Sequence, residues 1–267
     1  MITLKNDAEI ALMREAGLIV GRCLEVLKSS VEAGMTTADL DRIAERFITD
    51  AGATPSFKGY HGFPATLCTS INDEIVHGIP SDKRVIRDGD IVSIDCGAIV
   101  GGMHGDAAVT VPVGDVPQDV LDMLRVAEES LWRGFAAARL GGRLTDISHA
   151  IEAHIRPHGY GIVEEYVGHG IGRALHEDPQ VPNFGRPGRG PRIEKGLVLA
   201  IEPMVNLGTR LTRTLDDDWT VVTQDGLPSA HFENTFTVTA EGPWVLTVED
   251  GGASILGPLL AEAAASA

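Results

Sequence analysis

Two apolar segments, residues 90–100 and 103–113, are joined by a short glycine-rich turn, and each carries one aspartate, Asp95 and Asp106. Apolar segments of this length on either side of such a turn predict an antiparallel β-hairpin. A two-residue loop, whether its sequence is Val-Gly or Gly-Gly, makes the aspartates direct or diagonal neighbours on one face, about 5 to 8 Å apart. A three-residue loop would place them on opposite faces, because side chains alternate along a strand.

The two aspartates lack a positive partner within their own hairpin. No lysine or arginine lies between residues 90 and 113. Two carboxylates that face each other on a poorly hydrated sheet repel, and burying them unpaired is costly. They can share a proton, or one of them can stabilise a turn, but a multivalent cation is the natural counter-charge.

Three further polar side chains stand where a cavity needs them. Glu202 ends an apolar strand, and Pro203 stops the strand ladder directly after it. Glu233 lies on the polar side of an alternating strand at residues 231–238. His169 has a glycine on either side, which allows close approach of the backbone. We expect these three side chains to share one cavity with the two aspartates.

This set of four carboxylates and one imidazole has more oxygen ligands than a typical single zinc site. It suits two metal ions about 3.5 to 4 Å apart. Such a pair activates water at neutral pH and polarises a carbonyl, so the predicted chemistry is amide or ester hydrolysis. The three cysteines, Cys23, Cys68 and Cys96, are widely spaced and form neither a disulfide framework nor a metal clamp.

Amphipathic helices are predicted where apolar residues recur every three or four positions. They fall at residues 7–29, from a capping box at residues 36–39 to Gly52, and at 120–140 and 146–157. An offset of 107 residues sets Gly34 on Gly141 and Asp39 on Asp146. Either two amphipathic helices simply look alike, or the chain is an internal duplication with pseudo-twofold symmetry.

Strand patterns follow each helix pair and predict a largely antiparallel sheet. They lie at residues 90–100, 103–113, 197–202, 219–223 and 231–238. We therefore expect one catalytic domain at residues 1–250, followed by a Gly- and Ala-rich tail at residues 251–267. This tail has little to bury, which predicts a frayed segment or a loose helix.

Overall composition excludes several classes of protein. The formal net charge is −16 and the isoelectric point is near 4.9, which argues against direct nucleic-acid binding. No stretch approaches the roughly 18 apolar residues that span a membrane, and the N-terminus lacks the pattern of a secretory signal. We expect a cytoplasmic, globular protein without a membrane partner.

The order Asp, Asp, His, Glu, Glu in these local contexts resembles the methionine aminopeptidase family, in its bacterial type I form, over residues 7–248. The resemblance implies an α+β "pita-bread" fold, with a pseudo-twofold antiparallel sheet flanked by two pairs of helices. It also implies a metal-dependent aminopeptidase that hydrolyses the initiator methionine from nascent polypeptides when the second residue is small. A monomer that works in transient proximity to the ribosome is the expected form.

Individual roles follow from the same resemblance. One divalent ion (Co, Mn, Fe, Zn or Ni) would be held by Asp106, His169, Glu202 and Glu233, and a second by Asp95, with Asp106 and Glu233 bridging. Glu202 would shuttle the proton, while His77 and His176 would contact the substrate and stabilise the tetrahedral intermediate. The remaining substrate pocket would comprise Phe57, Tyr60, Phe63, Cys68, Leu175 and Trp219. A monovalent cation, Na or K, would lie at Asn72, Glu74 and Ser229.

Two positions depart from the family pattern. Many bacterial members have cysteine where this chain has Phe57, and phenylalanine where it has Leu175, which affects the expected shape of the pocket. Aminopeptidase P and prolidase are the nearest alternative enzymes, but they usually carry a substantial N-terminal domain, whereas the helices here start almost at Met1. A noncatalytic binding module on the same fold is disfavoured because all five expected ligands are intact.

Overall fold

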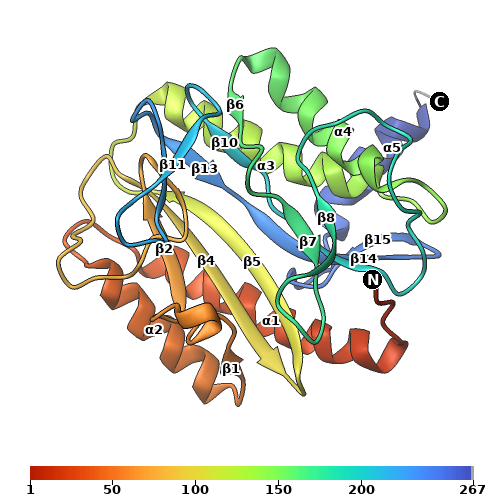
Figure 1. Cartoon of the computed structure of the whole chain (residues 1–267), viewed down its shortest axis with the longest axis horizontal. Coiled ribbons are helices and arrows are strands. Elements are labelled where there is room, and N and C mark those ends of the chain that lie inside the picture. Colours follow the sequence, from red (N-terminus) through yellow and green to blue (C-terminus); the bar gives the residue numbers. More distant parts are fainter. Residues whose placement is uncertain (266–267) are drawn as a thin grey trace.

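The computed structural model describes residues 1–265 of the chain, and Figure 1 shows how its elements are arranged. The helices are α1 (Asp7–Ser30), α2 (Thr37–Asp50), α3 (Gln118–Ala137), α4 (Leu144–Ile155) and α5 (Ala253–Ala265), with short 3-10 helices η1 (Tyr60–Gly62) and η2 (Arg156–His158). The strands are β1 (Thr54–Pro55), β2 (Leu67–Ile71), β3 (Glu74–Val76), β4 (Ile91–Val100), β5 (Met103–Pro112), β6 (Gly161–Ile162), β7 (Gly168–Gly170), β8 (Glu177–Val181), β9 (Val198–Ile201), β10 (Met204–Asn206), β11 (Thr212–Thr214), β12 (Val221–Thr223), β13 (Ser229–His231), β14 (Glu233–Thr239) and β15 (Gly242–Val245).

A single large sheet forms the frame of the molecule. Its strands lie side by side in the order β1, β4, β5, β14, β9, β7 and β8, with β2 added beside β4 and β15 beside β14. Two three-stranded sheets, β13-β10-β6 and β11-β12-β3, accompany it. The strand pairs formed within residues 1–265 are antiparallel, which confirms the predicted character of the sheet.

The predicted hairpin is the longest pairing in this sheet. Val100 lies opposite Met103, so the loop consists of Gly101 and Gly102. Both glycines have positive φ, 56° and 79°, a conformation that a two-residue hairpin loop requires and that glycine adopts without strain.

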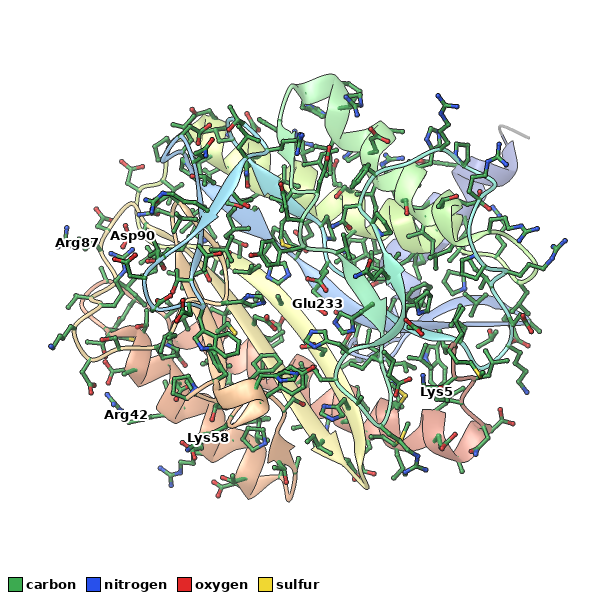
Figure 2. All side chains as sticks on the ribbon, in the orientation of Figure 1. Lys5, Arg42, Lys58, Arg87, Asp90 and Glu233 are labelled. Carbon is green, nitrogen blue, oxygen red and sulfur yellow. The ribbon has the colours of Figure 1, made fainter. Side chains whose placement is uncertain are left out.

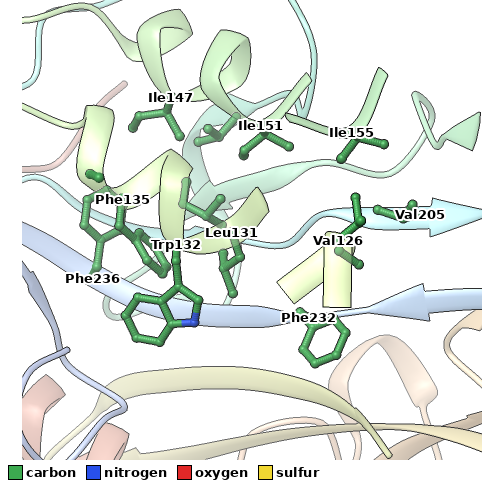
Figure 3. Packing of buried hydrophobic residues seen from close by; sticks show 14 of the residues in the cluster. Val126, Leu131, Trp132, Phe135, Ile147, Ile151, Ile155, Val205, Phe232 and Phe236 are labelled. Carbon is green, nitrogen blue, oxygen red and sulfur yellow. The ribbon is translucent and has the colours of Figure 1, made fainter. Parts of the chain in front are cut away.

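The two helix pairs cover different halves of the sheet, with α1 and α2 along one border in Figure 1 and α3 and α4 along the other. Helix α1 packs against β4 and β5, where Val92 and Ile94 join its leucines in one buried cluster. Helix α3 packs against α4 and contacts β14, with the rings of Phe135 and Phe236 4.8 Å apart. Figure 3 shows three isoleucines of α4, spaced four residues apart, facing this second cluster: Ile147, Ile151 and Ile155.

The offset of 107 residues extends from the sequence into matched local geometry. Thr36 and Arg143 stand one residue before α2 and α4. The backbone amide of each donates a hydrogen bond of 2.8 Å to the aspartate three residues later in the chain, Asp39 and Asp146 respectively. The turns that precede these two helices are also matched in their hydrogen bonds. Gly34 N donates to Ile86 O (2.9 Å) as Gly141 N does to Ile193 O (2.8 Å), and Ile86 N donates to Met35 O (2.8 Å) as Ile193 N does to Gly142 O (2.9 Å). This agreement supports the internal duplication.

Two parts of the fold differ from expectation. The predicted strand at residues 231–238 is two strands, because β13 ends at His231 and pairs with β10, whereas β14 starts at Glu233 and pairs with β5 and β9. The tail forms helix α5 against α3, and Leu256 is buried in the core. The prediction that this tail has little to bury is therefore wrong for Leu256, while residues 266–267 lie outside the described part.

Candidate metal centre

One row of side chains crosses three adjacent strands. Asp95 on β4 pairs with Ala108 on β5, and Ala108 pairs in turn with Glu233 on β14. Cys68 on β2 pairs with Asp95 from the other side. Because paired residues of a sheet point to the same face, the small side chain of Ala108 stands between two carboxylates.

The second aspartate of the hairpin joins this row from one step along β5. Asp106 lies opposite Gly97, two residues from Ala108, which makes it a diagonal neighbour of Asp95 on the same face. The Gly-Gly loop thus selects the diagonal arrangement from the two that the sequence allowed.

Glu202 extends the row to a fourth strand. In the register of β9 with β14, Ile201 lies opposite Asn234, so the next residue, Glu202, comes opposite Glu233. Strand β9 ends at Ile201, just before this carboxylate, as the proline at position 203 predicts. The 107-residue offset also carries Asp95 onto Glu202, so each half of the molecule contributes a carboxylate from the corresponding strand.

His169 reaches the site from the neighbouring strand β7, where it pairs with Ala200 of β9. Its Nδ1 atom lies 2.9 Å from the Gly170 carbonyl oxygen, so Nδ1 donates and Nε2 keeps its lone pair. Nε2 lies 3.5 Å from Glu202 Oε1. A Cβ at Gly170 would come within 2.1 Å of a backbone oxygen next to β7, which explains the glycine beside this histidine.

Burial dominates the electrostatics of the carboxylates. It raises the pKa of Asp95 to about 7 and holds the pKa of Asp106 well above its usual range. Burial likewise raises the pKa values of Glu202 and Glu233 well above those of exposed glutamates. The same cause lowers the pKa of His169 to about 3, which leaves a neutral imidazole that can bind a metal.

The carboxylates are also short of hydrogen-bond partners. Asp95 Oδ1, Asp106 Oδ1 and Glu233 Oε1 are buried and accept no hydrogen bond. No lysine or arginine belongs to the cavity lining formed by residues 1–265. Figure 2 shows Glu233 near the middle of the molecule and labelled basic residues such as Arg42 and Arg87 at its periphery. Oxygen atoms in this state fit divalent cations.

Donor atoms of this site gather in two overlapping groups. Within each group the potential ligand atoms lie within 4.8 Å of one another. The first group comprises Asp106, His169 and Glu233, and the second comprises Glu202, His231 and Glu233. Glu233 belongs to both groups, so its carboxylate lies within reach of both sets of donor atoms.

The carboxylates line a cavity of about 140 Å³ whose walls are otherwise largely apolar. All thirteen side chains that the sequence assigns to catalysis, divalent metal ions and substrate line this cavity, which two further residues, Val76 and His231, complete. The rings of Phe63 and Trp219 meet edge to face at 5.0 Å, and Phe57 and Leu175 are buried. This wall is suited to an unbranched apolar side chain.

Two further histidines line the cavity together with the carboxylates. His77 has positive φ (62°), contacts the ring of Tyr166 at 5.7 Å, and has a pKa that burial lowers to about 4. His176 Nδ1 lies 2.8 Å from the Tyr60 hydroxyl, and its ring meets that of His169 at 4.3 Å. Burial also lowers the pKa of His176. Both rings are therefore neutral hydrogen-bonding groups near pH 7.

The residues expected to bind a monovalent cation lie outside this cavity. The Asn72 carbonyl accepts a hydrogen bond from Ser229 N at 2.8 Å, which brings β13 beside β3. The Glu74 carboxylate is already engaged, by Ile71 N at 2.7 Å and by Arg84 at 3.2 Å. Any cation at this place would compete with Arg84 for the Glu74 carboxylate.

Sequence reasoning missed His231, because its one signal, the parity that it shares with Glu233, does not hold across a change of sheet. His231 has the same parity as Glu233, but the chain leaves one sheet at His231 and enters another at Glu233, so a simple alternation argument does not apply across Phe232.

Within residues 1–265, no helix has the length and apolar character needed to cross a membrane.

Known proteins resemble this chain over nearly its full length. A family model described as metallopeptidase family M24 matches residues 11–240. A methionine aminopeptidase of Clostridium acetobutylicum is 55% identical over 248 residues, which cover 93% of this chain and 99% of that relative. The crystal structure of a methionine aminopeptidase from Thermotoga maritima has a TM-score of 0.92 at 41% identity, covering 93% of this chain and 100% of that one. A prolidase from Pyrococcus furiosus has a TM-score of 0.75 at 22% identity, covering 92% and 65%, and shares the fold alone.

Proposed function

Because this chain belongs to the methionine aminopeptidases of metallopeptidase family M24, we propose that its cavity is a two-metal active site that removes N-terminal methionine from polypeptides. Membership of this metallopeptidase family implies that the chain binds divalent metal. One observation carries the finer proposal of two ions: three carboxylate oxygens are buried without partners in a cavity whose lining, among the residues that the structure describes, includes no lysine or arginine.

The row of carboxylates supports a division of the ligands between two ions. Asp106, His169, Glu202 and Glu233 would hold one ion, and Asp95 would hold the other, with Asp106 and Glu233 bridging. Cobalt, manganese, iron, zinc and nickel are all compatible with this mixture of oxygen and nitrogen donors. When bound, such a pair activates water and polarises the scissile carbonyl.

The protein's own groups would supply proton transfer and orientation. Glu202 would accept the proton of the attacking water and pass it to the departing amine, a role suited to a carboxyl whose pKa burial has raised. His77 and His176 would donate hydrogen bonds to the carbonyl oxygen as it gains charge. The contact between Tyr60 and His176 Nδ1 fixes that ring and leaves Nε2 for the substrate.

The apolar wall supports selectivity for methionine. Phe63 and Trp219 enclose one side, and Phe57 and Leu175 stand at the two positions where the sequence departs from its family. Their bulk leaves a narrow cavity, so we propose that a small second residue is needed for the peptide bond to reach the carboxylates.

A peptide panel assayed with added cobalt or manganese tests this function. We expect cleavage of Met-Gly and Met-Ala peptides and no cleavage of Met-Lys or X-Pro peptides. Trp219→Ala should raise KM for Met-Ala-Ser because it removes one wall of the cavity. Preferential cleavage of X-Pro peptides would contradict the proposal and indicate a prolidase.

Further proposals depend on this function. The substrates of the enzyme would be nascent polypeptides. The enzyme would therefore work in the cytoplasm and near the ribosome, without direct contact to nucleic acid. We also propose a monomer, a catalytic domain at residues 1–250, and an Na or K ion held near Asn72, Glu74 and Ser229. Analytical ultracentrifugation tests the first of these, and a dependence of activity on monovalent salt tests the last.

A further inference from the structure

His231 is held in one place at the end of β13. Its backbone N donates to Thr110 Oγ1 at 2.8 Å, and the same hydroxyl donates to the His231 carbonyl oxygen at 2.9 Å. Its register partner on β10 is Met204. The residue is 2% exposed, so its ring has little freedom and no access to bulk water.

The Nε2 atom of this ring points at two of the proposed ligands without bonding to either. It lies 3.8 Å from Glu202 Oε2 and 3.8 Å from Glu233 Oε2, and it is buried with no hydrogen-bond partner. A separation of 3.8 Å is too long for a hydrogen bond. It fits two ligand atoms that each lie about 2.0 to 2.2 Å from a shared ion.

Glu202 therefore stands between two imidazoles. Its Oε1 atom faces His169 Nε2 at 3.5 Å, and its Oε2 atom faces His231 Nε2 at 3.8 Å.

We propose that His231 donates Nε2 to the ion that Glu202 and Glu233 hold, so that this ion has two imidazole ligands, His169 and His231. The inference deepens the proposed function and rests on it, because it concerns the same site. A second nitrogen ligand favours ions with high affinity for imidazole, such as cobalt, nickel and zinc, over manganese.

The number of bound imidazoles can be counted in the full-length chain loaded with two equivalents of Co(II). An imidazole bound to Co(II) shows a ring N–H proton shifted far outside the normal NMR range. We expect such signals from two histidines in the wild type and from one in His231→Gln. The matched control is His104→Gln, which removes a buried histidine that bonds Ser56 and lies outside the cavity lining, and should keep both signals.

Calorimetric titration of the metal-free proteins gives a second readout. His231→Gln should bind the tighter Co(II) ion at least about tenfold more weakly than the wild type, whereas His104→Gln should match the wild type. A wild-type spectrum with one bound imidazole would overturn the inference, and this test stands even if His231→Gln does not fold. Failure of the wild type to bind Co(II) at all would instead refute the proposed function.

Discussion

At the scale of single residues, the side chain of Ala108 decides how closely Asp95 and Glu233 can approach. It stands between them in the register of three strands and is 4% exposed. A larger side chain would push the carboxylates apart, and two ions bridged by carboxylates need short separations. The alanine is therefore a requirement of the site.

Ala108→Val should weaken binding of divalent metal at least about tenfold. Substitutions of residues that position metal ligands typically lower metal affinity by this amount or more. Overpacking should also lower the free energy of unfolding by about 1 to 3 kcal/mol. Ala107→Val is the matched control, because Ala107 is equally buried but belongs to the cluster on the helix side. Calorimetry should find unchanged metal affinity in this control, and equal loss in both variants would refute the role of Ala108.

The sequence predicts Asp95 and Asp106 on one face because a hairpin loop fixes their register locally. Glu202 and Glu233 are predicted for a similar reason, by strand ends and alternation. His231 escapes such reasoning because its position depends on a change of sheet at Phe232, and only the tertiary structure shows where its ring points.

At the scale of elements, the two halves use the same device to start their second helix, an aspartate that bonds the backbone before it. At α2, Asp39 also accepts the Thr36 hydroxyl at 2.7 Å and a bond from Arg42. These hydrogen bonds lower the pKa of Asp39 to about 2, and the bond from the Thr36 hydroxyl makes the largest contribution. The carboxylate form is therefore favoured in the folded chain.

This shift predicts a pH dependence. The pKa of aspartate in an unfolded chain is about 3.9. The stabilisation of the folded chain by the Asp39 carboxylate is therefore fully present above about pH 4 and is lost as the pH falls through about 2. Asp39→Asn should be less stable than the wild type at pH 7, and the difference in free energy of unfolding should shrink below about pH 4. Carboxyl NMR of the wild type should give a midpoint near 2 for Asp39, and a midpoint near 4 would contradict the capping account.

The N-terminal segment supports the loop that carries His176. Lys5 is buried and bonds Glu177 Oε2 at 2.7 Å, next to that histidine, and its own backbone N donates to Gly196 O at 2.7 Å. The pair thus joins the start of the chain to the wall of the cavity.

Lys5→Met should lower the free energy of unfolding by about 3 kcal/mol, because it leaves the largely buried Glu177 carboxylate without its partner. It should also raise KM, since the His176 loop loses a support. Urea unfolding and steady-state kinetics measure the two effects. Lys195→Met, which removes an exposed ion pair with Asp7, is the control and should change stability by at most about 1 kcal/mol. Equal effects of the two substitutions would contradict the proposed support.

At the scale of the whole molecule, the candidate site lies where the two halves meet, because β5 of one half pairs with β14 of the other. The helix pairs and the antiparallel sheet are predictable from periodicity, whereas the 107-residue offset alone does not distinguish a duplication from two similar helices. The short strand β3, near His77, is not predictable, since three residues carry too little pattern, whereas β12 falls within the strand predicted at residues 219–223. The overall Gly- and Ala-rich composition of the tail does not indicate the packing of Leu256, although Ile255, Leu259 and Leu260 lie close to it in the sequence.

The central claim is that buried carboxylates hold the metal ions that hydrolysis requires. Its most direct test is the turnover of Met-Ala-Ser by the metal-free chain, before and after cobalt is added. The account predicts no turnover without metal and recovery as two ions bind per chain. Undiminished turnover by the metal-free protein would contradict it.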